Sequence, residues 1–251
     1  MTASRSAKKQ RLDVALLERN LADSREKAQA LILSGKVTVD GQTADKPGRV
    51  VLPQAHIEVD EPLKYVSRGG LKLEAALANF KIPVQGRVCM DIGTSTGGFT
   101  DCLLQHGAAR VHAVDTGAGQ IDWKLRTNPL VVLHERVNAR YLSIDEIGEL
   151  VDLITCDVSF ISVTLLIPAL GKLLAPKGDW IILVKPQFEA GREFVGKGGI
   201  IRDPAVHRLA CDKVADAVET AGFSTELMDS PILGGEGNRE FLLYARAPVR
   251  A

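Results

Sequence analysis

The sequence predicts an α/β protein whose larger part is a doubly wound sheet, preceded by a small α+β domain. Two observations carry this prediction. From Val88 onward, short apolar runs alternate with stretches of helical pattern, as they do in parallel sheets buried on both faces. Before residue 60, two short helical segments are followed by a hairpin pattern. The larger part is therefore expected to be Rossmann-like, with its ligands at the carboxyl ends of the strands.

The composition is that of an ordinary globular chain. Of the 251 residues, 45% are hydrophobic and 25% are charged, which leaves room for one α/β domain and a smaller unit. No apolar run approaches the roughly 20 residues that span a bilayer, and the basic N-terminus lacks the apolar segment of a secretory signal. The four cysteines contain no Cys-x-x-Cys pair, which argues against zinc or a disulfide framework. We therefore expect a cytoplasmic protein without a membrane segment.

The net charge of zero conceals an asymmetry between the two parts. Residues 1–72 hold 13 Lys and Arg against 9 Asp and Glu, whereas residues 73–251 hold 18 against 22. A basic front end joined to a mildly acidic body suggests that the front end meets nucleic acid.

The front domain is expected at residues 9–60, with two helices and a small sheet. Residues 11–17 carry apolar side chains at helical spacing. Ser24 is suited to cap a second helix, which Gly35 would end. Residues 36–43 indicate a strand with an Asp-Gly hairpin turn, and residues 56–59 indicate a closing strand.

This order of elements resembles the alpha-L RNA-binding domain, first known from a small-subunit ribosomal protein. The matching motifs are Arg11-Leu12-Asp13, Ser24-Arg25 and Leu33-x-Gly-Lys-Val-x-Val-Asp-Gly-Gln. The resemblance implies RNA contacts by basic side chains of this domain, and the candidates are Arg11, Arg25, Lys27 and Lys36. A domain of the same shape that binds no RNA is the alternative.

Residues 61–66 indicate an extended linker, and the second domain is expected at residues 67–246. Its first helix would begin near Ser67 and carry Lys72 in the first turn. The helix dipole disfavours a cation there, so this placement hints at a function for Lys72.

The next strand, residues 88–92, runs into a turn with the spacing Asp-x-Gly-x-x-x-Gly-Gly. Three glycines, Gly93, Gly97 and Gly98, would let the backbone approach a ligand closely. A dinucleotide site has its second glycine where this chain has Ser95, and the carboxylate of Asp91 would repel a pyrophosphate. The same carboxylate can meet the ammonium group of S-adenosylmethionine, directly or through water. The turn therefore predicts a pocket for S-adenosylmethionine, with an ordinary strand–turn–helix as the alternative.

Further strands are expected at residues 110–115, 130–134, 151–157, 179–186 and 239–245, with a helix from Asp203-Pro204 to Gly222. Polar side chains follow several of these strands. We expect Asp115 to hold the cofactor's ribose, unless it only caps its loop, and Asn138 to face the adenine. Asp157 and Lys185 should emerge side by side, either as a functional pair or as a structural salt bridge.

Lys72, Asp157, Lys185 and Glu240 match, in order and context, the Lys-Asp-Lys-Glu tetrad of FtsJ-like ribose 2′-O-methyltransferases. Together with the front domain, the glycine turn, the motif from Ser67 to Lys72 and the motif from Asp122 to Arg126, they make the chain resemble the TlyA family over nearly its whole length. The resemblance implies methylation of a cytidine ribose in ribosomal RNA. The RNA of the large subunit is the first candidate, and the RNA of the small subunit is the second. It makes S-adenosylmethionine the cofactor, ribosomal RNA or ribosomal subunits the partner, and Arg68 a further RNA-binding candidate.

In the implied mechanism, the ribose 2′-hydroxyl attacks the sulfonium methyl group. Lys185 either removes the hydroxyl proton or stays charged and orients the hydroxyl. Asp157 positions Lys185, while Lys72 and Glu240 complete the network. Two other classes remain as alternatives: a membrane-active protein, because the family carries an old haemolysin name, and an RNA-binding module with an inactive methyltransferase body.

Two rival methyltransferase types fit the residues less well. Enzymes that methylate base amino groups use an Asp/Asn-Pro-Pro-aromatic run, but residues 157–160 are Asp-Val-Ser-Phe. Enzymes that methylate cytosine carbon need a thiolate. Cys156 adjoins Asp157, but strand alternation points it into the helix layer, where a buried apolar role is expected.

Overall fold

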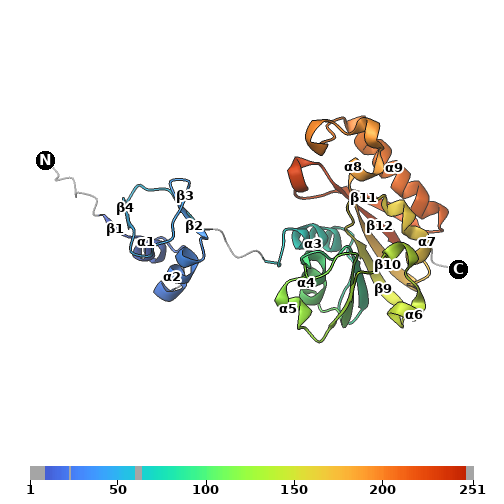
Figure 1. Ribbon diagram of the computed structural model, residues 1–251, viewed down its shortest axis with the longest axis horizontal. Coiled ribbons are helices and arrows are strands. Elements are labelled where there is room, and N and C mark those ends of the chain that lie inside the picture. The colour runs from blue at the N-terminus through green and yellow to red at the C-terminus, as the bar shows by residue number, and fades with distance from the viewer. Residues whose placement is uncertain (1–8, 23, 60–63, 247–251) are drawn as a thin grey trace. The chain divides into compact units, whose positions relative to one another are not determined.

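The computed structural model describes residues 9–22, 24–59 and 64–246. The chain divides into two compact units, residues 1–62 and 63–251 (Figure 1). Residues 61–63 of the linker predicted at 61–66 lie outside the described residues. The prediction is wrong for the described remainder: Tyr65 is buried in the core of the second unit, and the N–H of Val66 donates to the carboxylate of Asp101 (2.8 Å). Within the described part, no helix is long and apolar enough to cross a membrane.

The first unit packs two helices against small antiparallel sheets. Its elements are β1 (Gln10–Arg11), α1 (Leu12–Glu18), α2 (Arg25–Leu33), β2 (Val37–Val39), β3 (Gln42–Thr43), β4 (Val50–Val51) and β5 (Ile57–Val59). The core forms where Leu12 and Leu16 of α1 meet Ile32 of α2. The hairpin turn between β2 and β3 has positive φ at both Asp40 (52°) and Gly41 (77°), which suits the twist of a tight hairpin.

The second unit contains a seven-stranded sheet in the order β11-β12-β10-β9-β6-β7-β8. The strands are β6 (Val88–Ile92), β7 (Arg110–Asp115), β8 (Val131–Glu135), β9 (Val151–Cys156), β10 (Leu174–Val184), β11 (Ser224–Asp229) and β12 (Phe241–Arg246). Strands β8, β7, β6, β9 and β10 are parallel, and β12 runs antiparallel to both of its neighbours. The predicted doubly wound fold is confirmed.

Helices cover both faces of this sheet because its strands alternate their side chains. Leu153 and Leu183 face the core formed with α3 and α4, whereas Ile154 and Val184 face the core formed with α7 and α9. The helices are α3 (Gly69–Asn79), α4 (Gly98–Gln105), α5 (Trp123–Arg126), α6 (Ile144–Ile147), α7 (Ile167–Leu170), α8 (Pro186–Glu189) and α9 (Pro204–Thr220). Short 3₁₀ turns are η1 (Ala139–Tyr141), η2 (Val163–Leu165), η3 (Arg192–Phe194), η4 (Lys197–Gly199) and η5 (Gly235–Gly237).

Two features differ from the sequence prediction. Strand β11 was not expected, because its sequence is polar and mostly exposed; it forms as an edge strand by pairing with β12. Strand β10 begins at Leu174 rather than at Asp179, with an irregular register between these two residues. Neither difference affects the carboxyl ends of the strands. There, the direction of chain progression reverses between β6 and β9, which is where a doubly wound sheet opens a crevice.

Candidate active site

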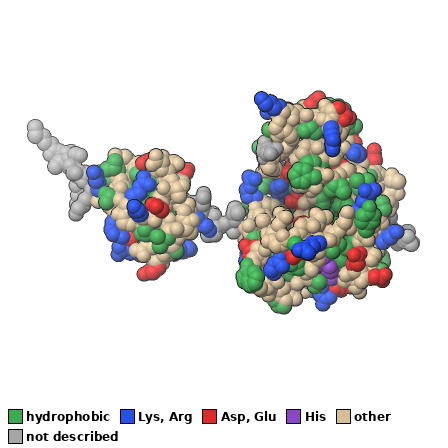
Figure 2. Space-filling view, in the orientation of Figure 1, with side chains coloured by type: hydrophobic (Ala, Val, Ile, Leu, Met, Phe, Trp, Pro, Cys, Tyr) green, Lys and Arg blue, Asp and Glu red, His purple; other side chains and the backbone are tan. Residues whose placement is uncertain are grey.

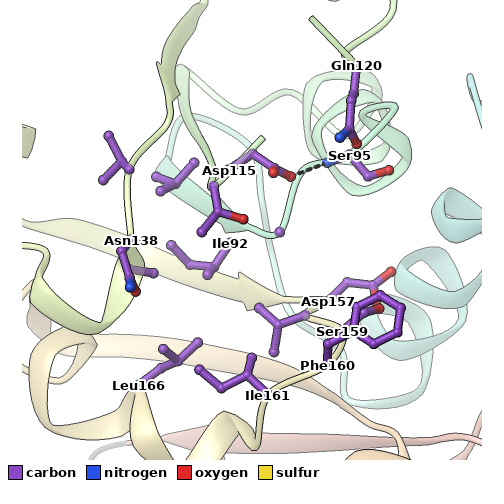
Figure 3. Close-up of a pocket in the computed structure, with 16 residues that line it drawn as sticks. Ile92, Ser95, Asp115, Gln120, Asn138, Asp157, Ser159, Phe160, Ile161 and Leu166 are labelled. Atoms are coloured by element: carbon purple, nitrogen blue, oxygen red, sulfur yellow. Dashed lines mark hydrogen bonds between the residues drawn. The ribbon is translucent and has the colours of Figure 1, made fainter. Parts of the chain in front are cut away.

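Two adjoining cavities lie at the carboxyl ends of β6, β7, β9 and β10. The first, of about 360 Å³, is bordered by the ends of β6 and β7 and by residues 157–161 (Figure 3). Its charged lining residues are Asp115 and Asp157, and none of the described residues that line it is Lys or Arg. We call it the anionic cavity.

The second cavity, of about 280 Å³, contains the opposite balance of charge. It is lined by Arg68, Lys72 and Lys185, with Asp157 as the acidic member. We call it the cationic cavity. The two cavities share four lining residues: Gly93, Ser95, Asp157 and Ser159. A ligand in one cavity can therefore meet a ligand in the other at this boundary.

The glycine turn after β6 holds these elements close together. Gly93 has φ +82°, and a Cβ atom there would lie 2.4 Å from the carbonyl oxygen of Asp157. A Cβ at Gly98 would lie 2.2 Å from Ser67 Oγ, so this glycine lets the start of α4 approach the start of α3. Gly93 and Gly98 both line cavities.

Gly97 was predicted to bind the cofactor, and its geometry indicates a different role. It lines neither of the two cavities; it has φ +97°, and a Cβ there would lie 2.3 Å from Leu125 Cδ1. Gly97 therefore shapes the turn by letting α5 pack beneath it.

Asp91 also differs from the prediction that it meets the cofactor's ammonium group. Its side chain is fully buried, and its two oxygens accept hydrogen bonds from Thr100 Oγ1 (2.7 Å) and Thr155 Oγ1 (3.0 Å). Burial raises the pKa of this carboxyl to about 7, against the opposing effect of the two hydroxyls. Asp91 lines neither cavity, because its strand position directs it into the core, where it ties β6 to α4 and β9.

Asp115 and Asn138 do lie at the anionic cavity (Figure 3). The carboxylate of Asp115 accepts hydrogen bonds from the backbone N–H groups of Ser95 (2.8 Å) and Gly117 (2.7 Å). It thus caps its loop and also faces the cavity, so the two alternatives considered for it are compatible. Asn138 is exposed, and its Oδ1 accepts from the N–H of Arg140 (3.1 Å).

The four residues of the predicted tetrad form two ion pairs. Lys72 Nζ lies 2.5 Å from Glu240 Oε2, with both side chains at least nine-tenths buried. Lys185 Nζ lies 2.6 Å from Asp157 Oδ1 and donates a hydrogen bond to Ser159 Oγ (2.9 Å). Asp157 Oδ1 has no aligned hydrogen-bond donor among the described residues, so its contact with Lys185 is an ion pair rather than an oriented hydrogen bond. Lys72, Asp157 and Lys185 line the cationic cavity, and Glu240 lies behind Lys72.

Ser159 and Phe160 belong to the site but were not predicted. The side chain of Phe160 is 92% exposed at the edge of the anionic cavity, and its ring lies 5.2 Å from that of Phe188. Its φ of +65° is rare for an aromatic residue. The sequence carries no signal for this placement, because backbone strain and exposure appear only in the folded chain.

The RNA-binding candidates of the first unit are partly engaged within it. Asp13 is fully buried and accepts hydrogen bonds from Arg11, Arg25 and Gln29. The Arg11 guanidinium holds the pKa of this carboxyl well below its usual range. About half of each arginine side chain remains exposed, so both can still meet a ligand.

Lys27 is exposed and Lys36 is half-buried, and Figure 2 shows Lys and Arg side chains over the visible face of this unit. Arg68, the remaining RNA-binding candidate, is exposed at the rim of the cationic cavity in the second unit.

Two other chemistries lack support in the described residues. Cys156 is 1% exposed, and burial raises the pKa of its thiol, so it is unsuited to act as a thiolate nucleophile. Among the described His, Cys, Asp and Glu side chains, no group of three or more could hold a metal ion.

The chain is similar in sequence and fold to several known proteins. A family profile described as FtsJ-like methyltransferase matches residues 65–247, and one described as S4 domain matches residues 10–57. The 16S/23S rRNA (cytidine-2′-O)-methyltransferase TlyA of Mycobacterium tuberculosis is 44% identical over 243 residues, which are 96% of this chain and 91% of that protein. A provisionally named rRNA methyltransferase of Bacillus subtilis, YqxC, is 49% identical over 246 residues, covering 97% of this chain and 88% of that protein. A solved structure from Streptococcus thermophilus, provisionally named a hemolysin, is 44% identical with a TM-score of 0.73, covering 97% of this chain and 90% of that one.

Proposed function

The chain belongs to the FtsJ-like methyltransferase family, and we propose that it methylates the ribose 2′-hydroxyl of a cytidine in ribosomal RNA. The resemblance to the TlyA family is confirmed by the FtsJ-like and S4 profiles and by the 44% identity to the Mycobacterium tuberculosis protein. The choice of a cytidine in ribosomal RNA is supported by the similarity to the Mycobacterium tuberculosis protein, which is named a 16S/23S rRNA (cytidine-2′-O)-methyltransferase.

The observation that carries the proposal is the contrast between the two adjoining cavities. The anionic cavity suits a ligand that is cationic and carries no phosphate, whereas the cationic cavity suits the phosphate-rich backbone of RNA. Because the cavities meet at Asp157 and Ser159, a methyl donor in one would face a ribose in the other. This is the arrangement that transfer between a sulfonium and an RNA hydroxyl requires.

The methyl donor of the family is S-adenosylmethionine, and the anionic cavity fits it. Ile92, Val114 and Leu166 provide apolar surface for an adenine ring, and Asp115 can accept hydrogen bonds from ribose hydroxyls. The lack of Lys and Arg among the described lining residues disfavours a dinucleotide, whose phosphates need donors or positive charge. When bound, the cofactor supplies an electrophilic methyl group on a positively charged sulfur.

The chain's own residues then act on the RNA hydroxyl. The Nζ of Lys185 is held by the carboxylate of Asp157 and the hydroxyl of Ser159. From there it can orient the 2′-hydroxyl of the RNA. It can then either accept the hydroxyl proton or, as a cation, stabilise the negative charge that develops on the oxygen. Asp157 positions Lys185, and Lys72 adds a second cation that Glu240 holds in place. Alignment of the two reactants is the main contribution expected, and good alignment can supply up to about 7–11 kcal/mol.

The first unit is proposed to deliver the RNA. Its partly exposed arginines and its basic surface are suited to phosphate contacts, which do not depend on base sequence. The hemolysin names among similar proteins suggest membrane activity instead, but no contact or cavity described above favours that function.

The test is transfer of labelled methyl groups from S-adenosylmethionine to 16S and 23S rRNA transcripts, followed by mapping of 2′-O-methyl positions. We expect label at a cytidine ribose and none when the target nucleotide is a 2′-deoxycytidine. A chain lacking residues 1–62 serves as a second arm and should bind the cofactor while methylating rRNA poorly. Label on a base, or on no RNA at all, would refute the proposal.

A further inference from the structure

Glu240 reaches Lys72 by passing directly over Gly234. A Cβ atom built on Gly234 would lie 2.0 Å from Glu240 Oε1 and 2.4 Å from its Cδ, which is closer than real atoms approach. Gly234 has φ −69°, a conformation that any residue adopts, so the backbone does not require glycine here. Among the described residues, the three atoms nearest to such a Cβ all belong to the Glu240 side chain, so the space that this side chain occupies is what favours glycine here.

We infer that Gly234 is a positioning residue for the proposed methyl transfer: its missing side chain leaves the room in which Glu240 holds Lys72 at the cationic cavity. Any side chain at this position would displace the carboxylate, because the end of a flexible side chain moves more readily than the surrounding backbone. Lys72, buried beside it, would then lose its partner. An unpaired buried cation shifts toward water, and so away from the place where it meets the ribose.

Hydrogen bonds hold the turn that carries Gly234 in place, so the backbone is not free to move and relieve the contact with Glu240. The N–H of Gly234 donates to the carbonyl of Asn238 (2.9 Å). The buried Asn238 side chain in turn donates to the carbonyl of Gly199 (2.9 Å) and accepts from the N–H of Ile201 (3.1 Å). The carbonyl of Glu240 itself accepts from the N–H of Ser230 (3.0 Å). The backbone at both ends of the contact is therefore held, and the side chain of Glu240 is the part that would move.

The neighbouring glycine provides a matched control. A Cβ atom at Gly235, in the same turn, would have no atom of the described residues within 4 Å beyond its chain neighbours. Gly234→Ala and Gly235→Ala thus add the same methyl group at adjacent positions, one against Glu240 and one into open space.

The inference rests on the proposed function, so the experiment has one readout that depends on RNA and one that does not. With the full chain and a 23S rRNA transcript, Gly234→Ala should lower kcat by about 10²-fold while the Kd of S-adenosylmethionine and the Tm stay near wild type. Gly235→Ala should keep the wild-type kcat. In a Glu240→Ala background, Gly234→Ala should cost less than about twofold more, because the group through which it acts is gone.

The second readout is the rate at which Lys72 is acetylated by trace acetic anhydride, measured by peptide mass spectrometry. Gly234→Ala should raise this rate several-fold, and Gly235→Ala should leave it unchanged. If wild type methylates no RNA, the proposed function fails, but the acetylation rates still test the positioning role. Equal kcat and equal Lys72 acetylation in the two alanine variants would overturn the inference, and so would full additivity with Glu240→Ala.

Discussion

The carboxylate of Asp157 lies 2.6 Å from the Nζ of Lys185, on the boundary shared by the anionic and cationic cavities. Asp157 follows β9 and Lys185 follows β10, and these strands are hydrogen-bonded neighbours in the sheet. The pair is therefore placed by the sheet itself rather than by a flexible loop. It lies at the point where a methyl donor and a ribose would meet.

Lys185→Ala should lower methyl transfer to rRNA by at least about 10²-fold, because the hydroxyl loses the group that orients it and handles its proton. The Kd of S-adenosylmethionine, measured by calorimetry, should change little, since Lys185 lines only the cationic cavity. Lys177→Ala is the matched control, because Lys177 is exposed near the opposite end of the same strand. Substantial turnover by Lys185→Ala would refute the role given to the pair.

Asp115→Ala should weaken S-adenosylmethionine by about tenfold or more, which corresponds to the loss of a hydrogen bond to a charged group. The carboxylate also caps the N–H groups of Ser95 and Gly117, so part of the loss would come from a looser loop. Calorimetry with S-adenosylmethionine measures the change, and Asp145→Ala, an exposed change on α6, is the control. Tight binding of NADH to the wild-type chain would contradict the assignment of the cavity.

Asp91 should make the stability of the protein depend on pH in an unusual direction. Its folded pKa is about 7, whereas an unfolded aspartate titrates near about 3.9, so the unfolded chain releases this proton first as the pH rises. The contribution of this group to the free energy of unfolding is therefore fully present below about pH 4. As the pH rises from there to about 7, the free energy of unfolding falls by roughly 4 kcal/mol on account of this group. Asp91→Asn, which does not titrate, should remove this effect.

The measurement is urea unfolding of wild type and Asp91→Asn at a series of pH values. Other groups change stability equally in both proteins, so their difference isolates Asp91. Wild type should lose stability relative to the variant between about pH 4 and about pH 7. A difference that stays constant over this range would show that the buried carboxyl titrates normally.

Replacing Phe160 by glycine should lower activity without lowering stability. A non-glycine residue at φ +65° is strained, so Phe160→Gly should keep or raise the free energy of unfolding, by about 1 kcal/mol. The exposed ring lies at the cavity edge, where it is available to stack on a base of the RNA, so the same change should lower rRNA methylation about tenfold. Phe160→Ala removes the ring but keeps the strain. It should match the glycine variant in activity and fall below it in stability, and wild-type activity in both variants would remove Phe160 from the site.

Much of the architecture was predictable from local patterns. Apolar runs between helical segments predicted the strands from β6 to β10 and the last strand β12. Helix ends could be predicted from Ser24, from Asp203 and from the glycines after helices, because capping depends on residues that are neighbours in sequence. The residues just after strands could also be placed, because the carboxyl ends of parallel strands share one edge. Asp115, Asp157 and Lys185 were located in this way. The polar edge strand β11 was missed, because it depends on pairing with β12 rather than on its own pattern.

What the sequence could not reveal were the contacts made by residues far apart in the chain. Whether Asp91 faces a ligand or two threonines depends on how β9 and α4 pack around β6, and the pattern of β6 is the same in either case. The separation of charge into two cavities, the exposure of Phe160 and the space that Gly234 leaves for Glu240 likewise arise only when distant segments meet. Local sequence sets the backbone path and the order of the elements. Which side chain reaches which partner is decided by packing, because that free energy depends on atoms contributed by the whole domain.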